Sequence, residues 1–86
     1  MSAETELGIV THYFGKIGVA AIRITEGVLA VGDTIHVKGH TADFTANIDS
    51  IQVEHLKVPT AKPGDTVGVK VPQKCHEHDK VFKVTP

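Results

Sequence analysis

β-Branched side chains dominate this sequence and restrict what it can fold into. Val, Ile and Thr supply 12, 7 and 9 of the 86 residues, whereas Leu supplies three and Met one. These side chains lose rotamer freedom in a helix and pack well on a pleated surface. We therefore predict an all-β fold, and the short length predicts a single domain over residues 1–86.

Alternating apolar and polar positions, separated by turn residues, predict short strands. The strands are expected at residues 8–14, 17–22, 34–38, 44–48, 67–71 and 81–84. The apolar phase shifts from even to odd positions between Ile48 and Ile51, so a bulge or sharp bend is expected near Asp49 and Ser50. Small closed barrels need such corners. The predicted architecture is a small six-stranded antiparallel β-barrel.

Composition narrows the cellular setting. Cys75 is the only cysteine, so an intramolecular disulfide is impossible, and a lone thiol suits a reducing compartment. The acidic start of the chain lacks the basic and apolar regions of a signal peptide. No apolar run approaches the roughly 20 residues needed to span a membrane. A cytoplasmic location without membrane contact is therefore expected.

Charge is distributed unevenly although the net charge is only −1. Residues 1–56 carry three basic and seven acidic side chains, whereas residues 57–86 carry six lysines and three acidic side chains. One interpretation is that the lysines protect strand edges and face solvent. The alternative is a basic face that binds RNA. Net charge near zero argues only against bulk electrostatic binding of nucleic acid.

Catalytic motifs are not found. The nearest string to a phosphate-binding loop, residues 15–18, has neither the spacing nor the following helix, so we expect no GTP binding by this chain alone. Serine occurs only at Ser2 and Ser50, and no pair of carboxylates has a spacing suited to hydrolysis. We therefore predict a protein that is not an enzyme and needs no cofactor.

The densest group of reactive side chains is Cys75-His76-Glu77-His78-Asp79. It is open to three interpretations: a solvated loop, a weak metal site, or a cysteine activated by a histidine. The spacing matches no known zinc motif, so we favour a solvated loop and predict no metal site. The histidines at 12, 36 and 55 alternate with apolar positions and are expected to face solvent or a partner.

Two segments resemble the second domain of elongation factor Tu and related translational GTPases. In the first segment the matching residues are Val19, Arg23, Ile24, Gly27, Val31, Gly32 and Asp33. The second runs from Ile51 to Glu54 and continues over Ala61-Lys62-Pro63-Gly64-Asp65-Thr66-Val67-Gly68-Val69. The resemblance covers most of residues 16–71 and implies a free-standing β-barrel of the translation-protein type.

This resemblance also implies partners. It points to a binding module that contacts tRNA, ribosomal RNA or a protein of the translation apparatus. The candidate contact residues are Arg23, Gln52, Glu54 and His55. The family's acidic pair near the first strand is replaced here by Gly8-Ile9, so delivery of aminoacyl-tRNA is not implied. Two alternatives remain, a protein-interaction barrel unrelated to RNA and a small metal-binding protein that uses residues 75–79.

Overall fold

An all-β fold is confirmed by the computed structural model, which describes residues 3–40, 42–54 and 56–85. Within these ranges the strands are β1 (Ala3–Phe14), β2 (Val19–Ile24), β3 (Leu29–Ala30), β4 (Thr34–Lys38), β5 (Asp43–Asn47), β6 (Ile51–Val53), β7 (Leu56–Val58), β8 (Thr60–Ala61), β9 (Thr66–Lys70) and β10 (Lys80–Thr85). The described part of the chain contains no helix that could cross a membrane.

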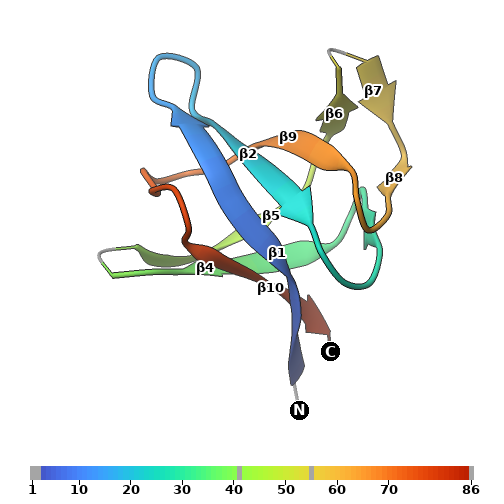
Figure 1. Ribbon diagram of the computed structural model, residues 1–86, viewed down its shortest axis with the longest axis horizontal. Coiled ribbons are helices and arrows are strands. Elements are labelled where there is room, and N and C mark those ends of the chain that lie inside the picture. Colours follow the sequence, from blue (N-terminus) through green and yellow to red (C-terminus); the bar gives the residue numbers. More distant parts are fainter. Residues whose placement is uncertain (1–2, 41, 55, 86) are drawn as a thin grey trace.

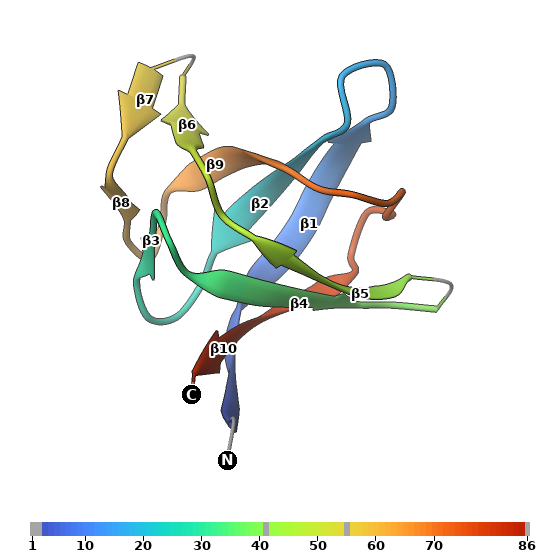
Figure 2. The same ribbon diagram turned by 180° about the vertical axis from the view of Figure 1, so that it is seen from behind.

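The strands form one large curved sheet and one small sheet (Figures 1 and 2). The large sheet has the order β5-β4-β10-β1-β2-β9-β6-β7, and the small sheet pairs β3 with β8. All recorded strand pairs are antiparallel. Among the described residues no pairing joins β5 to β7, so closure into the predicted barrel is not shown.

The predicted number of strands was wrong for a physical reason. The additional strands β3, β6, β7 and β8 have only two or three residues each. Alternation needs about four residues to be recognised in a sequence, so such strands leave no pattern. The expected bend is confirmed, because the chain leaves β5, bends at Asp49 and resumes as β6.

Inward-facing side chains from both ends of the large sheet build the core. On β4, Ile35 and Val37 are fully buried while the residues between them face outward, as the sequence predicted. On β9, Val67 and Val69 are buried in the same alternation. The fully buried large side chains are Leu7, Val10, Ile22, Ile24, Leu29, Ile35, Val37, Ile48, Ile51, Val67, Val69 and Val81.

His36 connects three strands on the outward face of the sheet. Its Nδ1 lies 2.8 Å from Glu4 Oε2 on β1, and its Nε2 contacts Asp43 Oδ1 on β5. The His36 side chain is only 16% exposed. The sequence predicted that it faces solvent or a partner, whereas the structure holds it between two carboxylates. The hydrogen bond to Asp43, followed by that to Glu4, raises the pKa of His36 above its ordinary value of 6.5. The same bond lowers the pKa of Asp43 below 3.8.

This arrangement predicts a stability contribution confined to a pH window. Because the folded pKa of His36 is raised, its contribution is complete below about pH 6.5 and is lost as the pH rises through the folded pKa. Because the pKa of Asp43 is lowered, its contribution is lost as the pH falls through that lowered value. At pH 5.5, His36→Gln should lower Tm by about 2–6 °C.

Thermal unfolding followed by circular dichroism at pH 5.5 and pH 9 tests this expectation. The difference in Tm between the wild type and His36→Gln should shrink towards zero at pH 9, since the neutral imidazole no longer forms an ion pair. A difference that is the same at both pH values would show that His36 acts through packing alone.

Candidate binding groove

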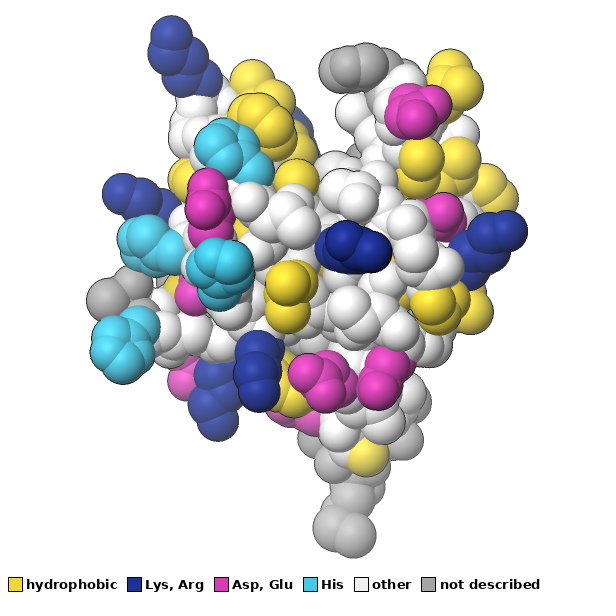
Figure 3. Space-filling model, viewed as in Figure 1, with side chains coloured by type: hydrophobic (Ala, Val, Ile, Leu, Met, Phe, Trp, Pro, Cys, Tyr) yellow, Lys and Arg dark blue, Asp and Glu magenta, His cyan; other side chains and the backbone are white. Residues whose placement is uncertain are grey.

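A groove of about 330 Å³ lies between the β1–β2 hairpin and the β6–β7 hairpin. Its lining consists of Phe14, Ile17, Val19, Ala21, Gln52, Glu54, Thr66, Val67 and Gly68. Figure 3 shows it as a notch between two projecting lobes at the top of the molecule. The start of β1 and the end of β10 lie at the opposite pole (Figure 1), so the groove is open at the end of the fold farthest from them.

The floor of the groove is formed by small residues in one row across the sheet. Ala21 of β2 pairs with Gly68 of β9, and Gly68 pairs with Gln52 of β6. A Cβ atom added at Gly68 would lie 3.3 Å from Val19 Cγ1, which is a tight contact. Ala21 has only a methyl side chain and Gly68 has none, so the space above them stays open as the groove.

One wall is apolar and exposed. Phe14 ends β1 with 46% of its surface accessible, and Ile17 in the following turn is 60% exposed. The turn is tight, because Gly18 N–H donates to Phe14 O over 2.9 Å and Gly18 has a φ of 65°. The His12 ring packs edge-on against Phe14, with ring centroids 4.5 Å apart. Two large apolar side chains are thus held in solvent on a rigid hairpin.

The opposite end of the groove is polar. Glu54 follows β6 directly, and since Val53 pairs with Leu56, it opens a two-residue connection. Its φ is 50°, a left-handed conformation that costs energy for a side chain such as Glu. Asn-Gly is the pair that such connections favour. Glu54 is therefore an unfavourable local choice at the rim of the groove.

The structure brings together only some of the predicted contact residues. Gln52 and Glu54 both line the groove. Arg23 is exposed on the same outward face of β2 as Ala21 and pairs with Thr66, but it is not part of the lining. His55 lies outside the described residues.

The apolar wall was not predicted from the sequence. The predicted strands place Phe14 at the end of one strand and Ile17 at the start of the next, which implies that both are ordinary sheet residues. A signal was present, because a large β-branched residue between Gly15-Lys16 and Gly18 is unusual in a tight turn.

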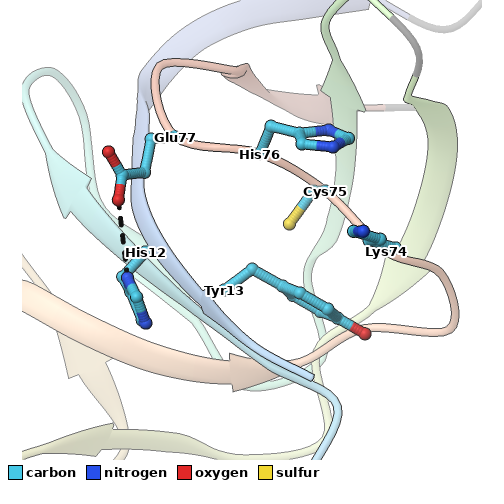
Figure 4. A pocket seen from close by; sticks show the side chains of 6 residues that line it. All are labelled: His12, Tyr13, Lys74, Cys75, His76 and Glu77. Atoms are coloured by element: carbon cyan, nitrogen blue, oxygen red, sulfur yellow. Dashed lines mark ion pairs between the residues drawn. The ribbon is translucent and has the colours of Figure 1, made fainter.

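A second hollow of about 410 Å³ lies beside the 75–79 segment (Figure 4). It is lined by His12, Tyr13, Lys74, Cys75, His76 and Glu77. The prediction of a solvated loop was wrong for Cys75, which is 1% exposed. Burial, with a smaller effect of the Asp79 carboxylate, raises the pKa of the Cys75 thiol to about 11. The thiol is therefore protonated at neutral pH and is not an activated nucleophile.

Metal binding at this hollow finds no support in the geometry. Among the described residues, no group of three or more His, Cys, Asp or Glu side chains is arranged to hold a metal ion. His12 Nδ1 instead lies 3.5 Å from Glu77 Oε1, an exposed ion pair (Figure 4).

Three aspartates close turns of the same design. Each donates its backbone N–H to the carbonyl of the residue three positions earlier, while one carboxylate oxygen accepts the N–H of that residue. The aspartates are Asp33, Asp65 and Asp79, with carboxylate distances of 2.8, 3.1 and 2.8 Å. The residue before Asp33 and Asp65 is glycine, at a φ of 96° in both turns. His78 takes that place before Asp79 at a φ of 73°, so the 75–79 cluster is a structural turn.

Comparison with known proteins gives relatives of one kind. No family model matches the chain. An uncharacterized protease of Methanocaldococcus jannaschii is 36% identical over 80 residues, which is 92% of this chain and 19% of that protein. A collagenase of Porphyromonas gingivalis is 30% identical over 81 residues, or 93% of this chain and 22% of that protein. The chain spans about a fifth of the length of the curated relatives it matches.

Two crystal structures share the fold. Both are of the C-terminal domain of a Geobacillus thermoleovorans protein described as a U32 peptidase, and both have a TM-score of 0.84. The first is 22% identical to this chain in sequence, and the match covers 90% of this chain and 96% of that domain. The second is 23% identical, and the match covers 91% of this chain and 90% of that domain. This chain has the same fold as these two domains.

The resemblance to translation factors is therefore wrong as an assignment, and so are the RNA and translation-apparatus partners drawn from it. The matching motifs have a structural explanation. Gly32-Asp33 and Gly64-Asp65 close the repeated turns, and Gly27 has a φ of 71°. Such residues are required by turn geometry, which unrelated β folds share, and they carry no information on the ligand.

Proposed function

We propose that this chain is a non-catalytic accessory domain of a peptidase-like protein and that its groove binds an extended stretch of polypeptide. The observation that carries the proposal is the groove itself, with its exposed apolar wall at Phe14 and Ile17 and its floor of small residues.

The dimensions and chemistry of the groove favour a polypeptide. Its volume of about 330 Å³ lies at the lower end of the roughly 300–1,000 Å³ range of ligand pockets, which suits one or two side chains. The relatives are named protease and collagenase, proteins that act on polypeptides. Among the described residues of the lining, Glu54 is the one titratable side chain, so these residues offer no nucleophile paired with a base. These features support binding without catalysis.

Binding of fluorescein-labelled gelatin peptides, measured by fluorescence anisotropy, tests the proposal. Ala21→Phe places a ring on the floor of the groove and should weaken binding at least about tenfold, since a filled pocket loses its ligand contacts. Thr45→Phe is the matched control, because Thr45 is also an outward-facing strand residue but lies on β5, outside the groove. It should bind as the wild type does.

Two results would contradict this function. Equal binding by Ala21→Phe and the wild type would show that the groove is not the peptide-binding site. Cleavage of the gelatin peptides by the purified chain, retained after repeated purification, would contradict the non-catalytic role.

A further inference from the structure

The charged side chain at the polar end of the groove is placed where the backbone disfavours it. Glu54 lines the groove at a φ of 50°, in a position where Asn would be accommodated more readily. Among the described residues its carboxylate takes part in no recorded ion pair or side-chain hydrogen bond. An unfavourable residue that stabilises nothing within the described fold is a candidate for ligand contact.

The groove has an apolar end and an acidic end. At the apolar end, Val19 lines the groove with Phe14 and Ile17 and pairs with Lys70 of β9. At the other end, Thr66 and Glu54 line the groove together. Arg23 lies beyond Thr66 and outside the lining. Arg23 is on β2 and Glu54 follows β6, and these two strands are two interstrand spacings, about 9.5 Å, apart. This separation exceeds the screening length of about 8 Å at physiological salt, so the Arg23 charge does not cancel that of Glu54.

The two ends are separated by two steps of an extended peptide. Val19 pairs with Lys70 and Arg23 pairs with Thr66, so the row at the apolar end and the row at the acidic end are four residues apart along β9. Side chains of an extended ligand point to the same side at every second residue, with a spacing of about 6.6 Å. A ligand side chain against the apolar wall therefore places the side chain four positions away, at about 13 Å, beside Glu54.

We infer that Glu54 selects the charge of the ligand, so that the groove takes an extended peptide with a basic residue four positions from an apolar one. This inference rests on the proposed function of the groove. The apolar side chain contacts Phe14, Ile17 and Val19, and the Lys or Arg side chain pairs with the Glu54 carboxylate. Such an exposed ion pair is worth a preference of about 2- to 5-fold in affinity and weakens with salt.

The test uses three labelled peptides that differ at one position, containing Leu-Ala-Ala-Ala-Lys, Leu-Ala-Ala-Ala-Gln or Leu-Ala-Ala-Ala-Glu within the same flanking sequence. The wild-type chain should bind the Lys peptide about 2- to 5-fold more tightly than the Gln peptide and bind the Glu peptide most weakly. Glu54→Gln should bind all three with equal affinity. Glu54→Arg should reverse the order, while Thr45→Phe should retain it.

A second measurement separates ligand selection from a structural role. Glu54→Asn relieves the backbone conformation and should raise Tm by about 2–4 °C while it abolishes the preference for Lys. A fall in Tm would overturn the argument from strain.

The outcomes distinguish a failure of the inference about Glu54 from a failure of the proposed function of the groove. Equal wild-type binding of the three peptides, or a Lys preference that survives in Glu54→Gln, overturns the role of Glu54 and leaves the groove as a peptide site. No binding of any of the three peptides, with gelatin peptides also unbound, overturns the proposed function as well.

Discussion

Gly8→Ala is expected to abolish folding of this chain. Gly8 lies on β1 between β10 and β2, next to a break in the β1–β10 register. A Cβ atom at this position would lie 2.0 Å from the carbonyl oxygen of Arg23 and 2.9 Å from its carbonyl carbon. These are backbone atoms of a paired strand and cannot rotate away. The loss in the free energy of unfolding should exceed about 4 kcal/mol, beyond ordinary overpacking of side chains.

Gly15→Ala provides the matched control in the same part of the chain. The nearest atom to its added Cβ would be Tyr13 Cε2 at 3.6 Å, an ordinary van der Waals contact. Its free energy of unfolding should change by less than about 0.5 kcal/mol. Urea unfolding followed by circular dichroism measures both variants. A folded Gly8→Ala protein with near wild-type stability would show that β1 and β2 are farther apart than described.

Ile35→Ala is expected to have the second largest effect. Ile35 is fully buried on β4, and removal of its side chain leaves a cavity that the surrounding β-branched residues fill poorly. The free energy of unfolding should fall by about 2–5 kcal/mol. The neighbouring change Thr34→Ala should cost about 1 kcal/mol or less, because it removes an exposed hydrogen bond from Thr34 Oγ1 to Asn47 Oδ1. Equal losses in the two variants would contradict the register of β4.

Local patterns were sufficient to predict much of the fold. The phase of residues 34–38 and the bend at Asp49 follow from period-two alternation, which depends only on neighbouring residues. The strands that escaped prediction are too short to alternate. The error in function had a related origin, since the repeated turns at Asp33 and Asp65 were interpreted as signs of a particular family.

The candidate site could be predicted only in part. Gln52 and Glu54 were predicted contact residues, but for RNA or a protein of the translation apparatus, and neither the hairpin wall nor the floor was predicted. The structure of the 75–79 segment was likewise predicted only in part. Its residues are polar in sequence, yet Cys75 is buried because the turn closed by Asp79 directs the thiol inward.

The sequence by itself determined the all-β class, the inward phase of the long strands and the turns, because each depends on residues a few positions apart. Only the tertiary structure decided which strands are neighbours. β9 pairs with both β2 and β6, so residues 19–21, 52–54 and 66–68 meet although long stretches of chain separate them. No local pattern encodes that order, since it is set by how the whole sheet curves to bury one core. The groove exists as a consequence of this strand order.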